Sequence, residues 1–428
     1  MLDRRLLREN PEILRQALVN RGYQFDLDAL IALDEERRRC IEQAQSLRER
    51  RNALSDQVGQ IIREGGDPEP VKAEVAQLKA ELDLLEDRER ELEAEFEGRW
   101  AEIPNIPKPE VPIGAGPEDN VVVHERGQKR TFDFDPQPHW EVATRLGIIE
   151  WERAAKMSAA RFVVDIGLGA ALERALINFM LDTHTRKHGY IEVFPPFLAC
   201  RRSMFGCGML PKFEEDMFRT TDGLYLIPTG EVPLTNMHQD EILDAADLPR
   251  CYTTYTACFR AEAGAAGQES RGLIRLHQFH KVELMKFTAP EQADQELEKL
   301  TANAEAILDA LEIPYRRVLL CTGDLGFSSC RTYDLEAWMP GMGKWLEVSS
   351  CSQFGDFQAR RVNTRYRPHP KAKPVFVHTM NGSGLACGRT LAAILENYQN
   401  ADGTVTIPQV LRPYLGGEAV IYPPSVKD

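Results

Sequence analysis

Two runs of apolar residues in the first hundred positions restrict the fold of this chain more than any other feature. In each run the apolar residues recur at alternating steps of four and three, which is the heptad seam of a helix packed along another helix. The first seam runs from Cys40 to Ile61, and the second runs from Val71 to Phe96. The sequence therefore predicts two long helices that pack against each other.

The segment between the two seams must reverse the direction of the chain. It reads EGGDPEP at 64–70, and glycine close to proline interrupts an α-helix. So short a break folds the second helix back on the first, which predicts an antiparallel helical hairpin. Counting outward from the turn pairs Ile61 with Val71 and Cys40 with Leu92. At about 1.5 Å per residue, the hairpin would form an arm roughly 50 Å long.

A proline-rich stretch, IPNIPKPEVPIGAGPEDN at 103–120, separates this arm from the rest of the chain. Beyond it, strand-like runs alternate with separate helices, which is typical of an α+β domain built on a mainly antiparallel sheet. We therefore predict an N-terminal domain at 1–104 with its arm at about 28–100, a linker at 105–120, and a second domain at 121–428. The expected strands are CYTTYTACF, IRLHQFHKVELMKF, TYDLEAW, KWLEVSSCS and PVFVHTM.

Three amphipathic helices are expected in the second domain. The first is GAALERALINFMLDTHTRKHGY, followed by the short strand YIEVFPPF, and the last is LACGRTLAAILENYQ. The acidic segment at 290–311 has the pattern of a helix on the protein surface.

Composition excludes several classes of protein. The net charge of −14 argues against bulk electrostatic binding of nucleic acid, although a local basic face remains open. No apolar run approaches the length of a membrane span, and MLDRRLLRENPE lacks the apolar region of a signal peptide, so we expect a cytoplasmic protein without a membrane partner. The nine cysteines show no zinc-site spacing and fit reduced thiols.

The first helix of the arm carries six arginines in two patches. Basic residues on a helix often form only a solvated face, and the hairpin itself could serve as a dimerisation device, a spacer or a lever. The six are Arg37, Arg38, Arg39, Arg48, Arg50 and Arg51.

The stretch FRAEAGAAGQESRGLIRLHQFHKVEL at 259–284 predicts a β-hairpin that carries many charges. In its second strand, alternation places Arg275, His277, Phe279, Lys281 and Glu283 on one face. Before the loop, an arginine at 260 could clamp a carboxylate or phosphate with two hydrogen bonds. The face could equally be a solvated one with cross-strand salt bridges, and the spacing alone leaves both interpretations open.

Three further segments offer groups that bind anions, metals or small polar ligands. NGSGLACGRT at 381–390 combines three glycines with an arginine at a helix start, where anions are favoured. WLEVSSCS offers Glu347, Ser349 and Ser350 as oxygen ligands suited to Mg²⁺, and IPTGEVPL offers Thr229 and Glu231. Strict alternation puts Ser350 on the opposite face from Glu347, so joint ligation by these two residues requires a β-bulge or a bend.

Taken together, these segments resemble the class II aminoacyl-tRNA synthetases, and within them the bacterial-type seryl-tRNA synthetases. The stretch at 259–284 looks like motif 2, GLACGRTLAAILENYQ like motif 3, and the helix with YIEVFPPF like motif 1, with Pro196 at its proline. PTGE, EVSSCSQFGDFQARR, NGSG, the arm and the linker are similar as well. The departures are Ala261 and Ala265, where the family often has serine, and Cys387 for valine; none removes a charged group.

The resemblance implies a class II catalytic domain at 121–428 that makes seryl-adenylate from L-serine and ATP. It would then transfer serine to the 3′-terminal adenosine of serine tRNA, and whether selenocysteine tRNA is also charged stays open. It further implies a homodimer and Mg²⁺ held by Glu347 and Ser350. The implied serine-binding residues are Thr229, Gly230, Glu231, Arg260, Glu283 and Ser383. The implied ATP-binding residues are Arg260, Ala261, Glu262, Leu276, Phe279, Glu347, Val348, Ser349, Ser350 and Arg389. Those implied in catalysis are Arg260, Glu347 and Arg389.

The resemblance also gives the arm a role, because in this family such an arm contacts the long variable arm of the tRNA through its arginines. Two alternatives remain. Synthetase relatives that aminoacylate a carrier protein lack the long arm, which this chain has. A catalytically inactive scaffold would have lost charged groups such as Arg260, Glu283 or Arg389, and all three are present.

Overall fold

The computed structural model describes residues 1–263 and 271–424, which divide into two compact units. The arm unit comprises Asp3–Val19 and Tyr23–Ile103, and the sheet unit comprises Met1–Leu2, Asn20–Gly22 and Pro104–Asp428. Ala265, one of the departures from the family pattern, lies outside the described residues.

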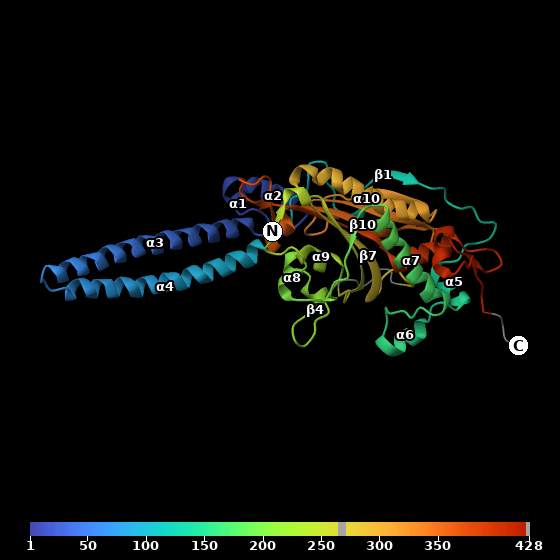
Figure 1. Cartoon of the computed structure of the whole chain (residues 1–428), viewed down its shortest axis with the longest axis horizontal. Coiled ribbons are helices and arrows are strands. Elements are labelled where there is room, and N and C mark those ends of the chain that lie inside the picture. The colour runs from blue at the N-terminus through green and yellow to red at the C-terminus, as the bar shows by residue number, and fades with distance from the viewer. Residues whose placement is uncertain (264–270, 425–428) are drawn as a thin grey trace. The chain divides into compact units, whose positions relative to one another are not determined.

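The arm unit is the predicted antiparallel helical hairpin. α3 (Leu27–Arg63) and α4 (Glu69–Trp100) run side by side, after the short helices α1 (Arg5–Glu9) and α2 (Pro11–Asn20) (Figure 1). Asp26 caps α3 by accepting a hydrogen bond from the Ala29 amide at 2.9 Å. The predicted seams lie where the helices meet: Cys40, Ala44, Leu78, Leu82, Leu92 and Phe96 are buried, and the seam residues nearer the turn, such as Ile61 and Val71, are half-buried.

The register of the hairpin differs from the predicted one at Cys40. Its thiol donates to the carbonyl oxygen of Leu85 at 3.4 Å, a contact about two helical turns from the expected partner Leu92. Counting from the turn assumes that residues pair one to one, whereas the seam residues of packed helices insert between several residues of the partner.

The sheet unit is built on eight strands in the order β1-β8-β9-β10-β13-β7-β6-β2. All neighbours are antiparallel except β2 and β6, which are parallel. This confirms the predicted α+β class with a mainly antiparallel sheet. The strands are β1 (Val121–Arg126), β2 (Ile191–Glu192), β6 (Arg250–Phe259), β7 (Gln278–Thr288), β8 (Tyr315–Leu319), β9 (Arg331–Met339), β10 (Lys344–Gly355) and β13 (His378–Ala386).

Three helices pack on this sheet: α7 (Leu168–Arg186), α10 (Ala293–Ala310) and α12 (Cys387–Asn397). α10 is a surface helix, as predicted, because Asp294, Lys299 and Asp309 on its outer face are exposed. Its apolar stripe, which includes Leu297, Leu300 and Ile307, is fully buried against β10 and β13. Glu296 is buried with this stripe, in an ion pair with Lys286 at 2.7 Å.

Two further predictions about strands need correction. The run that begins at Ile274 becomes a strand only at Gln278, so alternation does not hold before that residue. NGSG, which was expected to form a glycine-rich turn, lies inside β13, and β13 leads directly into α12. Glycine was taken as a turn signal, but here it allows neighbouring side chains to approach the strand closely, since a Cβ on Gly382 would stand 2.4 Å from Leu300.

The proline-rich segment packs on the sheet unit. The Asn105 side chain donates to the carbonyl oxygens of Ser328 at 2.8 Å and Phe354 at 2.7 Å, and Val111 is buried against Leu320 and Leu325. Among the described residues, no helix is long and apolar enough to cross a membrane.

The remaining elements are short. The helices are α5 (His139–Leu146), α6 (Trp151–Ser158), α8 (Arg201–Gly206), α9 (Glu231–Asn236) and α11 (Phe357–Val362). The strands are β3 (Leu198–Ala199), β4 (Tyr225–Leu226), β5 (Ile242–Asp244), β11 (Arg365–Arg367), β12 (Val375–Phe376), β14 (Val405–Thr406) and β15 (Val420–Ile421). The 3-10 helices are Pro117–Asp119, Glu214–Asp216, Ala245–Asp247, Pro290–Gln292 and Gln409–Leu415.

Candidate active site

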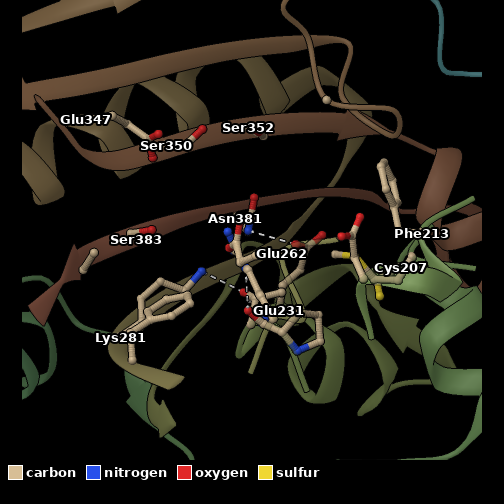
Figure 2. A pocket seen from close by; sticks show the side chains of 18 of the residues that line it. Cys207, Phe213, Glu231, Glu262, Lys281, Glu347, Ser350, Ser352, Asn381 and Ser383 are labelled. Atoms are coloured by element: carbon tan, nitrogen blue, oxygen red, sulfur yellow. Dashed lines mark hydrogen bonds between the residues drawn. The ribbon is translucent and has the colours of Figure 1, made fainter. Parts of the chain in front are cut away.

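A cavity of about 620 Å³ opens over the middle of the sheet, between β7, β10 and β13 and the starts of α9 and α12. Figure 2 shows Glu347, Ser350 and Ser352 along one strand of its wall and Asn381 and Ser383 along the next. Most residues expected to bind serine or ATP line this cavity. They are Thr229, Glu231, Arg260, Glu262, Leu276, Phe279, Glu347, Ser350, Ser383 and Arg389.

The other expected residues lie just behind the wall. Glu283 is fully buried beneath it, and Val348 and Ser349 are buried in β10. The Ser349 hydroxyl donates to the Ser383 carbonyl at 2.6 Å, and so joins β10 to β13. Ala261 is held by a hydrogen bond from its amide to the Asp216 carbonyl at 2.9 Å.

Gly230 is required by close packing at the start of α9. A Cβ at this position would stand 2.8 Å from the Thr254 side chain and 3.1 Å from Cβ of Glu283. The absence of a side chain therefore brings Thr229 and Glu231 directly over Glu283.

One end of the cavity holds two buried carboxylates joined by hydrogen bonds. The Asn381 amide nitrogen donates to Glu283 Oε1 at 3.0 Å and to Glu231 Oε2 at 3.2 Å. The Thr229 hydroxyl donates to Glu283 Oε2 at 2.6 Å and accepts from Lys281 Nζ at 2.8 Å. Lys281 also forms an ion pair with Glu283. This set can bind an ammonium group and a hydroxyl in fixed directions (Figure 2).

Glu231 holds a proton more tightly than an ordinary glutamate. Burial, with the nearby charge of Glu283 as the second cause, raises its pKa to about 7. The Gln358 amide donates to Glu231 Oε1, and Gln358 is itself fixed by the Thr379 hydroxyl at 2.7 Å. A cationic ligand beside Glu231 would stabilise the ionised form, lower this pKa and favour release of the proton.

The other end of the cavity presents two arginines and an aromatic ring. The Arg260 guanidinium lies 5.1 Å from the centre of the Phe279 ring, and its Nε donates to the Pro228 carbonyl at 3.3 Å. Arg389, the third residue of α12, donates to the carbonyls of Ile274 at 3.1 Å and Glu347 at 2.8 Å. These cations can bind phosphates beside a surface on which a base can stack.

Glu262 lies at the turn into the loop, with a positive φ of 52°, and forms an ion pair with Arg275. Positive φ is uncommon for a residue with a side chain, and the ion pair holds the carboxylate in place beside the cavity. Leu276 is buried next to this pair and packs in the core.

The β-bulge that joint ligation by Glu347 and Ser350 requires is present in β10. The register with β9 shifts between Glu347 and Ser349, so Glu347 pairs with Glu336 and Ser350 pairs with Asp334. Because those two partners stand two residues apart on β9, they share one face of the sheet, and Glu347 and Ser350 share it with them. The prediction of a bulge is confirmed.

The charges around this face suit a divalent cation. Burial would raise the pKa of Glu347, but the charges of Arg389 and Arg260 outweigh burial and lower it, so the carboxylate is ionised. The pKa of Asp334 is raised by burial and by the charge of Glu347, and its Oδ1 is buried without a hydrogen-bond partner. An ionised carboxylate and a hydroxyl are oxygen ligands of the kind that Mg²⁺ prefers.

Three residues of the site were not predicted from the sequence. Lys281 was placed on the ligand face by alternation, but no role was given to it. Asn381 precedes the glycines of NGSG and carries no separate signal. Gln358 comes from α11, far along the chain, and only the folded structure brings it to Glu231.

The six arginines of the arm divide into paired and unpaired groups. Arg37 is buried, 7% exposed, and held by Asp34 at 2.8 Å and by Glu93. Arg48 pairs with Glu86 and Glu89, Arg50 pairs with Glu74, and Arg51 donates to Asn52. Among the described residues of the arm, Arg38 and Arg39 are exposed and form no ion pair within the chain. Arg37 therefore has its donors committed inside the hairpin, whereas Arg38 and Arg39 are exposed and have no carboxylate partner within the described part of the arm.

Family models match both parts of the chain. Residues 1–107 match the seryl-tRNA synthetase N-terminal domain. Residues 212–398 match the tRNA synthetase class II core domain of the G, H, P, S and T enzymes.

Individual proteins match over nearly the full length. The serine–tRNA ligase of Carboxydothermus hydrogenoformans is 53% identical over 98% of this chain and 99% of its own, and that of Desulforudis audaxviator is 55% identical over 97% and 98%. Among solved structures, seryl-tRNA synthetase from Pyrococcus horikoshii complexed with ATP has a TM-score of 0.92 at 38% identity, covering 99% of this chain and 100% of that one. Because more than half of all positions are shared along nearly the whole length, the chain belongs to the seryl-tRNA synthetase family.

Proposed function

We propose that this chain is a serine–tRNA ligase that activates L-serine with ATP and then transfers it to serine tRNA. The observation that carries the proposal is the division of one cavity into two ends. Glu231, Glu283 and Asn381 form a polar end suited to a small amino acid. Arg260, Phe279 and Arg389 form an end suited to a nucleoside triphosphate.

In the first step, a carboxylate oxygen of serine attacks the α-phosphorus of ATP, and pyrophosphate leaves. Serine enters with its carboxylate ionised, so the step needs no general base. Arg260 would hold the serine carboxylate against the α-phosphate, and Arg389 would hold the distal phosphates. Most of the rate would come from this positioning and from charge stabilisation in the transition state.

The residues of β10 fit a magnesium ion, which would be held by Glu347 and Ser350. When bound, Mg²⁺ supplies positive charge to the phosphate oxygens. Phe279 would stack on adenine, with Glu262 and Leu276 beside it, and the segment from Glu347 to Ser350 would line the phosphates.

The polar end explains a preference for serine. Thr229, Glu283 and Ser383 can bind a hydroxyl and an ammonium group together, and alanine or glycine would leave these buried groups without a partner. Loss of a bond to a buried polar group is a large penalty, so both should be rejected strongly. Threonine has the hydroxyl and would be excluded by the shape of the pocket.

In the second step, a ribose hydroxyl of the terminal adenosine attacks the seryl carbonyl, and AMP leaves. We assign residues 1–104 to tRNA binding, 105–120 to a linker and 121–428 to aminoacylation. Arg38 and Arg39 are the foremost candidates for phosphate contacts on the arm, because no carboxylate within its described residues pairs with them. Recognition of an RNA stem by its shape requires such backbone contacts.

We further propose a homodimer in a reducing cytoplasm. β2 forms one edge of the eight-stranded sheet, and Ile191 and Phe194 beside it are 58% and 78% exposed. A hollow of about 550 Å³ between α7 and this edge is lined by Ile177, Leu181 and Phe194. All nine cysteines are free thiols, which fits a reducing compartment.

Serine-dependent exchange of pyrophosphate into ATP, followed by charging of purified serine tRNA, tests the proposal. We expect both activities, with serine preferred among the twenty amino acids. Exchange without charging of any tRNA would favour the carrier-protein ligase, and absence of both would favour an inactive scaffold. Charging of selenocysteine tRNA in the same assay decides whether it is a second substrate.

A further inference from the structure

A histidine near the end of α7 touches the strand that carries Ser383. His184 is fully buried, and its Nε2 lies 3.4 Å from the carbonyl oxygen of Gly384. Its Nδ1 lies 3.0 Å from Nδ1 of His188, which comes four residues later and just beyond the end of α7. A carbonyl oxygen can only accept, so Nε2 of His184 carries the proton and Nδ1 accepts from His188. Burial, assisted by the charge of His188, lowers the pKa of His184 to about 3, so the ring is neutral.

Gly384 is the extra residue of a β-bulge. The register of β13 with β7 shifts between Ser383 and Leu385, and Gly384 has no partner in that register. Ser383 lines the cavity, whereas Leu385 is buried in the core and Ala386 lines the cavity again. In a regular strand Leu385 would share the face of Ser383, so the bulge is what separates them.

The His184 ring occupies the space that a side chain at position 384 would need. A Cβ on Gly384 would stand 2.7 Å from Nε2 and 3.1 Å from Cδ2 of the ring. The bulge is therefore held on one side by the ring of α7, and on the other by the Ser349 hydroxyl, which donates to the Ser383 carbonyl at 2.6 Å. The two contacts act on the two peptide groups that flank Gly384, and the first of these also follows Ser383 directly.

We propose that His184 is a positioning residue for the serine pocket: its ring holds the bulge at Gly384 and thereby sets the direction of the Ser383 side chain. The inference rests on the proposed function, which assigns Ser383 to serine. His184 does not reach the substrate, because it is buried behind the strand. Its effect on the reaction passes through the backbone of β13.

The first test compares two substitutions of His184 with one of His188. His184→Phe keeps an aromatic ring but removes the donor to Gly384, and His184→Gln keeps a donor. His188→Gln is the matched control, since it leaves the contact with Gly384 in place. In pyrophosphate exchange, we expect His184→Phe to raise the KM for serine by about tenfold, the effect of one lost hydrogen bond. The KM for ATP should change by less than about twofold, and both glutamine variants should stay near the wild type.

A double-mutant comparison separates positioning from general packing. Ser383→Ala removes the hydroxyl that His184 is proposed to direct. If the inference holds, His184→Phe should add little to the serine KM of Ser383→Ala, because the two changes act on one interaction. If the two effects multiply, or if the KM values for serine and ATP rise together, His184 only packs the core and the inference is wrong.

The outcome remains informative if His184→Phe does not fold. His184→Asn, whose amide is too short to reach Gly384, then takes its place against His184→Gln, with the same expected rise in serine KM. Wild-type protein without serine-dependent exchange would overturn the proposed function itself. Wild-type exchange combined with an unchanged serine KM in the folded His184 variants would overturn only the positioning role.

Discussion

Glu283 receives hydrogen bonds from Thr229 and Asn381 and pairs with Lys281, although it is fully buried. A buried carboxylate is costly unless donors surround it, and here three side chains surround Glu283. Glu231 lies in the same site, and burial, with the charge of Glu283 as the second cause, raises its pKa to about 7.

Substitution of Glu283 tests the polar end of the cavity. Glu283→Gln keeps the size of the side chain but removes its charge, and should weaken serine use by about ten- to a hundredfold in kcat/KM, the range for a hydrogen bond to a charged group. The KM for ATP should change little. The measurement is pyrophosphate exchange at varied serine and varied ATP. Glu305 is also buried but lies outside the cavity, so Glu305→Gln serves as the control. Equal losses of kcat/KM for serine in the two variants would contradict the assignment of Glu283 to the serine pocket.

The raised pKa of Glu231 predicts a dependence on pH. Below about pH 7 the free enzyme holds a proton on Glu231, and the ammonium group of serine should displace it. Calorimetry of serine binding at pH 6 in buffers of different ionisation enthalpy should therefore show release of a proton. Glu231→Gln should release none.

The raised pKa of Glu231 also predicts how the stability of the protein depends on pH. The folded state binds the extra proton between the unfolded pKa of about 4.3 and the folded value of about 7, so wild-type stability should fall as pH rises through this window. Glu231→Gln should lack this decline. The measurement is the melting temperature of both proteins between pH 5 and pH 8. Equal changes of melting temperature with pH in the two proteins would contradict this prediction.

At the scale of the element, β-bulges orient the functional side chains of two neighbouring strands. The bulge in β10 brings Glu347 and Ser350 to one face, and the bulge in β13 separates Ser383 from Leu385. The first could be predicted from the sequence on the assumption that Glu347 and Ser350 bind one metal ion, because residues three apart in a regular strand lie on opposite faces. The second could not, since it depends on the contact between Gly384 and a helix distant in sequence.

The arm helices carry a prediction about RNA binding. Arg38→Ser with Arg39→Ser should weaken binding of serine tRNA and make its salt dependence shallower by up to about one unit per lost contact, while exchange stays unchanged. The measurement is tRNA binding at several salt concentrations. Arg90→Ser on α4 is the control, because its side chain is exposed on the acidic helix. An unchanged salt dependence in the double variant would place the RNA contact elsewhere.

Arg37 should behave differently from its two neighbours. It is buried between Asp34 and Glu93, so Arg37→Ala removes one of the two cations of each carboxylate, and Arg8 remains on Asp34 and Arg4 on Glu93. We expect a loss of stability on the order of 1–3 kcal/mol, discounted because Glu93 is partly exposed. The measurement is thermal unfolding followed by helical circular dichroism, and Arg37→Ala should melt at a lower temperature than wild type. A variant that melts at the wild-type temperature would contradict this prediction.

At the scale of the whole molecule, the division into two units predicts that the two half-reactions can be separated. Every residue proposed for serine or ATP lies in the sheet unit, and the proposed tRNA contacts lie in the arm unit. Replacing Leu30 to Phe96 by a short linker should preserve exchange and remove most tRNA charging. The ends to be joined are close, since Arg99 donates to the Asp26 carbonyl at 3.3 Å. Undiminished charging by the deletion variant would show that the arm has no role in RNA binding.

The proposed homodimer can be tested at the exposed edge of the sheet. Phe194→Asp puts a charge on a side chain that is 78% exposed in the single chain, and it should convert dimers to monomers at micromolar concentration. Light scattering after size-exclusion chromatography measures the mass. Ile113→Asp, at a comparably exposed apolar residue away from this edge, should leave the mass unchanged. A wild-type protein that is already a monomer under active conditions would contradict the dimer.

The sequence by itself determined the elements whose causes are local. Heptad spacing predicted α3 and α4, alternation predicted the strands β6, β9 and β10, and the motifs around Arg260, Glu347 and Arg389 predicted the residues that line the cavity. These features depend on side-chain periodicity and on short segments, which are visible in the chain before it folds.

Only the tertiary structure decided the features that depend on contacts between distant segments. It paired Glu296 of α10 with Lys286 in the core, placed NGSG in a strand, and brought Gln358 to Glu231. It also separated Arg38 and Arg39 from Arg37, because pairing depends on which carboxylates the second arm helix presents. The physical reason is common to all of these cases: burial and charge pairing are properties of the surroundings of a residue, and residues far along the chain supply those surroundings.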